Sequence, residues 1–474
     1  MLFNSLIFLV FFPTTALIYF LLPNLRLRNL FLLIASYYFY MNWNPRYAIL
    51  IAAVTGITYA SAILLEKVET SGKRKTITAF CIVLILSLLF TYKYLGFAAH
   101  VVSGTMRSLG LAITIPEFKL LLPVGISFFS FQAIGYLIDV YRKTIPAERE
   151  MINFAIFISF FPQLVAGPIE RAKNLLPQFR EMHPFSPVQA LDGMQMMLWG
   201  YFMKLCIAER IAPYADAVFN NYLHHNGNSL ALGIFFFSIQ IYCDFCGYSL
   251  LACGTAKCLG FNLMQNFNHP YLAGSIRDFW RRWHISLSTW FMDYLYIPLG
   301  GNRCSAPRQV FNLIVTFLVS GIWHGANWTF IFWGFLHGLL VSLHMLYRRY
   351  LPPVKLWKPV LAVLSIAVTF TVVSICWVFF RAENISSGFV ILRKVFTERG
   401  QLFNGDGLPN QLLGIFCIMI MFAVEIIREI KPEINLLFSP RRHPAAYIVM
   451  MASLTAFILL TAAFHGTQFI YFQF

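Results

Sequence analysis

The sequence predicts an all-α, polytopic membrane protein, because it is apolar along its whole length, poor in charge and punctuated by short basic loops. Of its 474 residues, 58% are hydrophobic and only 12% are charged, and the mean hydropathy is +0.66. A soluble domain carries roughly 25% charged residues, so this chain could not cover a globular surface with polar groups. A soluble enzyme, a disordered chain and a nucleic-acid-binding domain are therefore disfavoured, and the lipid bilayer is the expected surrounding.

Long apolar segments recur along the whole chain. A transmembrane helix needs about 20 apolar residues, which leaves room for roughly ten to thirteen passes. The clearest segments are 4–22, 29–43, 47–65, 77–97, 120–140, 190–211, 230–258, 311–323, 329–347, 360–380, 411–427 and 445–464. We expect about 11–12 transmembrane helices. No polar stretch is long enough for a separate domain, so a single membrane domain over residues 1–474 is predicted.

The basic loops predict an orientation. Segment 4–22 is interpreted as a first span rather than a cleavable signal peptide, because no basic region precedes it. Lys and Arg gather after the first, third and fifth segments: at Arg26 and Arg28, in loop 66–76 and in loop 142–149. Cytoplasmic loops are enriched in these residues, so the N-terminus is expected outside. The same rule explains the net charge of +16 without nucleic acid.

Segment 154–169 breaks the pattern. It is apolar but short, and it contains Pro162, Gly167 and Pro168. A segment of this length favours a re-entrant structure over a span. Because irregular backbone at membrane depth must be covered by protein or face a wet cavity, the segment also indicates an internal cavity.

Stretch 266–303 carries the first candidate site. Ser275 can cap a helix, with Asp278 three residues later. Polar residues then recur at helical spacing and predict one polar face: Arg277, Arg281, His284 and Ser288. Trp280 belongs to a broad aromatic face and is expected to line the substrate channel. The pattern predicts an amphipathic helix, and the alternative to an active site is an interfacial helix with arginines toward lipid phosphates.

Stretch 320–338 carries the second candidate. His324 lies in an apolar, glycine-lined context, with Asn327 one turn further on. Asn327 is expected to line the substrate channel. Ionisable groups at membrane depth are expensive and are functional candidates, and histidine accepts protons near neutral pH. The alternative is a packed histidine bonded between helices. For His337 and His344 the structural interpretation is preferred, because nothing polar surrounds them.

Stretch 235–249 carries the third. Gln240, Asp244 and Tyr248 are spaced to share one face of a hydrophobic helix. A carboxylate there needs a partner or a water-filled cavity, so pairing with an arginine and lining a substrate channel are equally favoured. No motif for ATP-driven transport, hydride transfer, or serine or zinc hydrolysis accompanies these residues, and no metal is expected.

Two of these stretches carry a resemblance to a known family. RDFWRRWHISLSTW at 277–290 and WHGANWTFIFWG at 323–334 resemble the membrane-bound O-acyltransferase (MBOAT) family, in particular its AlgI-like, alginate O-acetyltransferase branch. The similarity extends to LLPVGISFFSFQAIGYLIDVYR at 121–142 and FPQLVAGPIER at 161–171.

The resemblance implies that His324 is the family's invariant histidine and His284 its second active-site histidine. It implies a ring of helices around a cytoplasm-facing funnel, with re-entrant helices in its floor. It also implies an enzyme of the cell inner membrane that passes acetyl from cytoplasmic acetyl-CoA toward an exported polysaccharide, with an SGNH-type exported partner. Independently, the CoA phosphates need cations, and Arg281 and Arg282 lie beside His284.

Other functions stay open. The same fold could O-acetylate peptidoglycan or transfer D-alanine as DltB-like proteins do. A transporter or flippase without chemistry would use Asp244 and the histidines as a proton relay, although the paired repeats typical of transporters are not visible. Direct transfer and relay through an acyl-enzyme are both possible. Because long extramembrane regions are lacking, a separate partner is expected to grip the glycan.

Overall fold

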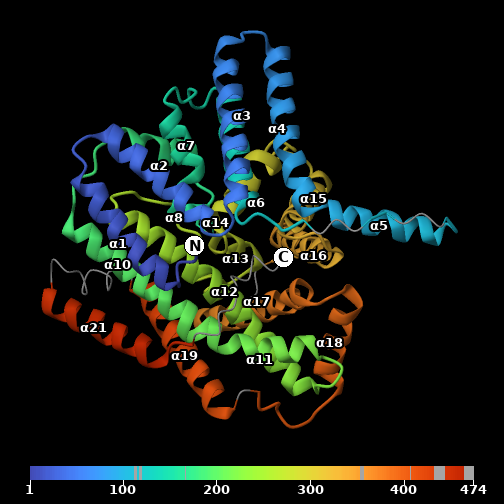
Figure 1. Ribbon diagram of the computed structural model, residues 1–474. Helices are drawn as coiled ribbons and strands as arrows, with labels where there is room; N and C mark the ends of the chain where they lie inside the picture. The colour runs from blue at the N-terminus through green and yellow to red at the C-terminus, as the bar shows by residue number, and fades with distance from the viewer. Residues whose placement is uncertain are drawn as a thin grey trace. The chain divides into compact units, whose positions relative to one another are not determined.

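The computed structural model is helical, which confirms the all-α prediction (Figure 1). It describes residues 1–474 except 112–114, 117–119, 166, 353–356, 406, 432–442 and 464–474, and no strand occurs in what it describes. The chain divides into two compact units: unit 1 is Met1–Gly193 with Ala252–Met264, and unit 2 is Met194–Leu251 with Gln265–Phe474. The expected single domain over 1–474 stays a prediction.

Unit 1 contains the first nine α-helices. They are α1 (Leu6–Leu21), α2 (Leu25–Met41), α3 (Ala48–Lys67), α4 (Ser71–Lys93), α5 (Leu95–Ser108), α6 (Ile126–Tyr141), α7 (Met151–Ser159), α8 (Phe161–Leu164) and α9 (Ala172–Leu175), with 3₁₀ turns at Pro45–Tyr47 and Leu176–Arg180. Helices α3 and α4 run side by side, and both pack on α6 (Figure 1).

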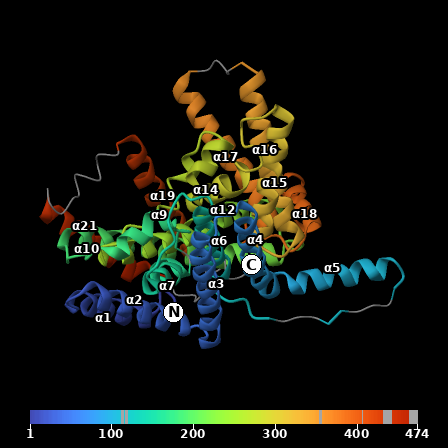
Figure 2. The ribbon, with the colours of Figure 1, turned by 90° about the horizontal axis from the view of Figure 1, so that it is seen from above.

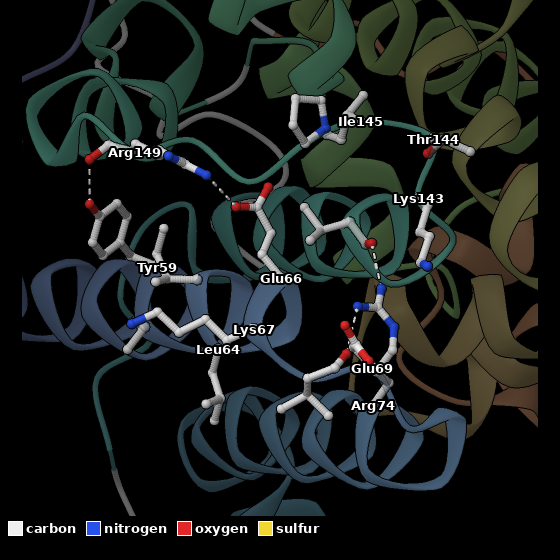
Figure 3. Close-up of a pocket in the computed structure, with 15 residues that line it drawn as sticks. Tyr59, Leu64, Glu66, Lys67, Glu69, Arg74, Lys143, Thr144, Ile145 and Arg149 are labelled. Atoms are coloured by element: carbon white, nitrogen blue, oxygen red, sulfur yellow. Dashed lines mark hydrogen bonds and ion pairs between the residues drawn. The ribbon is translucent and has the colours of Figure 1, made fainter.

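The loops after α3 and α6 meet in one groove of unit 1, with a volume of about 1570 Å³ (Figure 3). Lys67, Lys143 and Arg149 are among its lining residues. Glu66 accepts a hydrogen bond from the backbone N–H of Ala147 at 2.7 Å and lies 3.5 Å from Arg149. Two of the basic loops predicted to share one side of the membrane therefore lie next to each other.

Unit 2 contains most of the remaining helices, and two of its three boundaries with unit 1 fall inside α10 and α12. The elements are α10 (Pro187–Tyr201), a π-helical segment (Phe202–Ala208), α11 (Glu209–Asn220), α12 (Gly227–Cys258), a 3₁₀ turn (Pro270–Leu272), α13 (Ile276–Arg282), α14 (Ile285–Phe291), a second π-helical segment (Met292–Tyr296), α15 (Ala306–His324), α16 (Trp328–Tyr350), α17 (Lys358–Arg381), α18 (Ile385–Thr397), α19 (Leu408–Ile430) and α21 (Pro444–Thr461). Figure 2 shows α15 and α16 side by side.

Seven helical stretches in the described residues are long and apolar enough to cross a membrane. They are Pro45–Lys67, Ser71–Lys93, Gly227–Cys258, Trp328–Tyr350, Lys358–Arg381, Leu408–Ile430 and Pro444–Thr461. Each overlaps a segment predicted from hydropathy, and a chain with so many such helices is a multi-pass membrane protein. Reaching about 11–12 passes would also require shorter helices to cross, among them Leu6–Leu21 and Ile126–Tyr141.

The described residues of the short apolar segment 154–169 form two short helices as far as Leu164. Helix α7 has nine residues and α8 has four, and Phe160 separates them with a non-helical backbone. At 1.5 Å per residue, α7 reaches only about 14 Å, which is well short of the hydrocarbon core. These lengths agree with the expectation that this segment does not span.

Candidate functional site

His324 owes its position to a closely packed helical hairpin. Helices α15 and α16 approach so closely that a Cβ on Gly321 would lie 2.3 Å from the carbonyl oxygen of Phe330, and one on Gly334 would lie 2.3 Å from that of Phe317. Small residues at helix interfaces permit this approach between membrane helices. The glycines that surround His324 in the sequence therefore fix the distance between the two helices.

His324 is the last residue of α15 and is only 3% exposed. Its ring lies against Trp333 of α16, with centroids 5.0 Å apart, and against Phe380 of α17 at 5.5 Å. The chain after His324 is extended at Gly325, where a Cβ would lie 2.2 Å from the Phe330 ring. The imidazole is therefore held among aromatic side chains at the end of a rigid helix.

Asn327 does not lie one helical turn beyond His324, because α15 has already ended. Its side chain caps α16 by accepting from the backbone N–H of Thr329 at 3.1 Å, and its amide donates to the carbonyl of Glu383 at 3.3 Å. Ser, Thr, Asp and Asn are the usual capping residues. These bonds give Asn327 a capping role, and its place in a channel stays a prediction.

The prediction of one amphipathic helix that continues through His284 was wrong. Ser275 does cap the helix start, accepting from the N–H of Asp278 at 3.2 Å. Helix α13 nevertheless ends at Arg282, and α14 begins at Ile285. Arg277 and Arg281 are exposed, whereas His284 is buried, so the four polar residues do not form one face.

Segment 266–268 stabilises the break between α13 and α14. The backbone carbonyl of Asn266 accepts from the N–H of Ile285 at 2.8 Å, and the N–H of Asn268 donates to the carbonyl of Arg282 at 3.0 Å. The Asn266 side chain also accepts from the Ser286 hydroxyl at 2.6 Å. These bonds replace helical ones and stabilise two ends that would otherwise lack partners.

His284 itself adopts a left-handed conformation, with φ 42° and ψ 56°. Such values are uncommon outside glycine and cost stability, and they concentrate at functional sites. The side chain is 1% exposed, and burial lowers the pKa of His284 to about 3. The imidazole is therefore neutral at physiological pH.

Trp323 brings the two histidines together. Its ring centroid lies 6.1 Å from that of His284 and 5.0 Å from that of His324. His284 also meets Phe245 of α12 edge to face, at 4.7 Å. The two histidines singled out from separate stretches thus share one aromatic environment within unit 2.

Arg281 and Arg282 differ in exposure and in ion pairing. Arg282 forms ion pairs with Asp278 at 3.1 Å and with Glu429 of α19 at 2.9 Å. Arg281 is exposed. An exposed guanidinium keeps its donors available for phosphate, so Arg281 fits the predicted role better than Arg282.

Asp244 forms an ion pair with a lysine, whereas the partner considered from the sequence was an arginine. The Lys204 ammonium lies 2.6 Å from Asp244 and 2.8 Å from Glu209, and all three side chains are buried. It also lies 5.4 Å from the ring centroid of Tyr248. Sequence reasoning missed Lys204, although it is the single lysine of the apolar segment 190–211 and the cost of an intramembrane charge could have drawn attention to it.

Gln240 is partly buried on the same helix, and its side-chain oxygen has no hydrogen-bond partner among the described residues. The ion pairs favour a structural role for Asp244. Whether Gln240, Asp244 and Tyr248 line a channel stays a prediction.

His337 has a polar neighbour that the sequence interpretation did not anticipate. The indole N–H of Trp280 donates to His337 Nδ1 at 3.2 Å. Trp280 therefore lies next to His337. That it lines a channel stays a prediction. In the described part of the chain, no group of three or more His, Cys, Asp or Glu residues could hold a metal ion.

The fold and this site together define a class: multi-pass membrane proteins whose histidines lie in a buried aromatic environment. Within that class, the model of the membrane-bound O-acyltransferase family matches residues 142–380, and the chain belongs to this family. It is therefore an O-acyltransferase.

Several relatives are similar to this chain over most of their length. The chain is 40% identical over 431 residues to the probable alginate O-acetylase AlgI of Azotobacter vinelandii, covering 90% of this chain and 84% of that protein. It is 34% identical over 428 residues to a peptidoglycan O-acetyltransferase of Helicobacter pylori, covering 83% and 79%. It is 26% identical over 271 residues to a teichoic acid D-alanyltransferase of Bacillus subtilis, covering 54% and 67%.

Proposed function

We propose that this protein takes acetyl from cytoplasmic acetyl-CoA for the O-acetylation of an exported polysaccharide, alginate or a similar exopolysaccharide. The similarity to alginate O-acetylases supports the acceptor class. The observation that supports acyl transfer is the position of His324. This histidine is buried at the end of α15 and contacts the same indole as His284. Histidine is the side chain suited to accept a hydroxyl proton at neutral pH.

In this proposal His324 is the base. It takes the proton from an attacking hydroxyl, while the neutral His284 helps to orient the reacting groups across Trp323. Arg281 binds CoA phosphates from its exposed position, and Arg282 holds α13 against Glu429. The buried aromatic surroundings exclude water, which would otherwise hydrolyse a thioester.

The decisive experiment is transfer of isotope-labelled acetyl from acetyl-CoA in proteoliposomes. The wild-type chain should move label from CoA to an acceptor, and His324→Ala should not, although it inserts and purifies normally. His344→Ala, a histidine of α16 that is not among the predicted site residues, is the matched control. Label that stays on CoA with the wild-type chain would favour a transporter.

We propose an inner-membrane location with the N-terminus outside and a funnel open to the cytoplasm. The shared groove of loops 66–76 and 142–149 supports a common side for these loops (Figure 3). Gly72 is exposed, and a Cβ there meets nothing within 4 Å, so Gly72→Cys should fold normally. That cysteine should resist a membrane-impermeant thiol reagent in intact cells and react after permeabilisation; labelling of intact cells would invert the topology.

An exported SGNH-type protein is the proposed partner that places acetyl on the sugar. A glycan with many hydroxyls needs a long polar groove to be held in register. With acetyl-CoA inside proteoliposomes and glycan outside, acetylation should appear only when such a partner is added. Efficient acetylation by this chain alone would contradict the division of labour.

Peptidoglycan is the second candidate acceptor, favoured by the relative from Helicobacter pylori. Supplying the same proteoliposomes and partner with alginate or with peptidoglycan fragments separates the two. Higher turnover with peptidoglycan would replace the alginate proposal while leaving the acyltransferase chemistry unchanged.

A further inference from the structure

A third histidine lies in the same hairpin as His324. His337 is on α16, is 0% exposed and accepts the Trp280 N–H at Nδ1. A neutral imidazole carries one proton, so a ring that accepts at Nδ1 carries its proton at Nε2. The Trp280 bond therefore fixes a tautomer in which His337 Nε2 is a donor.

Two indoles pack on this imidazole. The ring centroid of Trp333 lies 4.9 Å from that of His337, and Trp377 of α17 lies 6.3 Å from His337 and 5.6 Å from Trp333. Both tryptophans are 0% exposed. His337 and the two indoles thus form a cluster of three rings in mutual contact, termed here the donor cluster.

Each ring of the donor cluster carries a buried N–H group without an acceptor. Within the described residues, His337 Nε2, Trp333 Nε1 and Trp377 Nε1 have no hydrogen-bond partner. Buried tryptophan and histidine N–H groups usually find one, because an unmade bond destabilises the folded chain. Three such donors in contacting rings point to an oxygen acceptor that is supplied from outside the chain.

The donor cluster adjoins the candidate base. Trp333 is the ring of the donor cluster that contacts His324, nearly perpendicular to it at 88°. In acyl transfer, negative charge develops on the carbonyl oxygen of the donor, and N–H groups that point to this oxygen lower the barrier. A cluster of donors one ring away from the base is placed for that oxygen.

We propose that His337, Trp333 and Trp377 bind the carbonyl oxygen of the acyl thioester, an inference that rests on the proposed function. The hydroxyl oxygen attacks the thioester carbon and gives its proton to His324, while the π electron pair of the C=O bond moves onto the oxygen held by the cluster. When this pair re-forms the C=O bond, the C–S bond breaks and the leaving thiolate takes the proton from His324.

Two substitutions of His337 separate this role from a structural one. In His337→Gln the amide nitrogen reaches the position of Nε2, so a donor is kept while the acceptor for Trp280 is lost. In His337→Asn the amide oxygen replaces Nδ1, so the Trp280 bond is kept while the Nε2 donor is lost. Removing one oxyanion donor lowers turnover about 10²-fold, and we expect this loss in kcat for His337→Asn and a much smaller loss for His337→Gln.

Binding of two unreactive CoA analogues gives a readout that a structural role would not change. One analogue is a ketone with CH₂ in place of sulfur, and the other is the ethyl thioether without the carbonyl oxygen. The wild type should prefer the ketone, and His337→Asn should lose that preference while His337→Gln keeps it. His344→Gln, on the same helix, is the matched control and should behave as wild type.

Trp333→Phe and Trp377→Phe extend the test if His337→Asn fails to fold, since each keeps a ring and removes one N–H. Each should reduce the preference for the ketone several-fold. An unchanged preference in these variants and in His337→Asn would overturn the donor cluster, whose N–H groups would then serve water. That result would leave the proposed function intact, whereas label that stays on CoA with the wild-type chain would overturn the proposed function itself.

Discussion

His324 and His284 reach the same indole from two segments that are built in different ways. His324 closes a regular helix of 19 residues, and glycines hold that helix against α16. His284 lies between two helices of seven residues each, in a left-handed conformation. The first segment positions its histidine by close helix packing, and the second does so by hydrogen bonds from a distant loop.

The left-handed backbone at position 284 has a cost that the helical backbone at position 324 does not have. A left-handed backbone at a residue other than glycine costs roughly 1–2 kcal/mol. Glycine or asparagine would fit position 284 with less strain. The role proposed for the His284 side chain accounts for a buried histidine at this strained position, whereas the backbone of His324 lies in a regular helix.

The largest expected effect is on His324. His324→Ala should lower acetyl transfer by about 10²–10⁴-fold, the usual contribution of a general base. Because α15 is held by glycine contacts rather than by this side chain, thermal unfolding in detergent should change little. A variant that transfers acetyl at the wild-type rate would remove His324 from the mechanism.

The next effect tests the strain at His284. His284→Gly should lose activity by about 10²-fold while unfolding at the same or a higher temperature than His284→Ala. Glycine relieves the left-handed strain, and alanine keeps it, which predicts a difference of roughly 1 kcal/mol in unfolding free energy. Equal stability of the two variants would mean that position 284 is not strained in the folded protein.

Sequence reasoning succeeded where the cause was local. Hydropathy predicted α16 and α17 to within a few residues, and the Ser275 cap followed from residues next to it. The stretch RDFWRRWHISLSTW contains neither Gly nor Pro, so nothing local predicts a break at Trp283. The break depends on Asn266, whose bonds form only once the chain has folded.

The partner of Asp244 was beyond local reasoning for the same reason. An intramembrane carboxylate predicts a cation nearby, but not which one. Lys204 is 40 positions away along the chain and approaches through a π-helical segment, a feature with no reliable sequence pattern. The hydrogen bond between Trp280 and His337 likewise joins residues whose proximity depends on helix packing.

A smaller effect concerns pH. An unfolded chain takes up a proton at His284 below about pH 6.5, but in the folded chain burial lowers its pKa to about 3. Stability from this group is therefore complete above pH 6.5 and is lost as the pH falls toward 3. The wild type should lose about 1.4 kcal/mol per pH unit below 6.5 relative to His284→Asn, in unfolding curves measured from pH 7 to pH 5. Parallel curves would show that folding does not lower the pKa of His284.

The smallest effects distinguish the two arginines beside His284. Arg282→Ala breaks ion pairs with Asp278 and Glu429 that are partly exposed, so it should lower stability by at most about 1 kcal/mol. It should leave the KM for acetyl-CoA nearly unchanged.

Arg281→Ala removes an exposed cation, so stability should stay constant. The KM should rise by roughly tenfold, because a charge-assisted bond to phosphate is lost. Steady-state kinetics and unfolding of both variants make the test. The opposite pattern would assign the phosphates to Arg282, and an unchanged KM in both variants would favour an arginine role at the lipid surface.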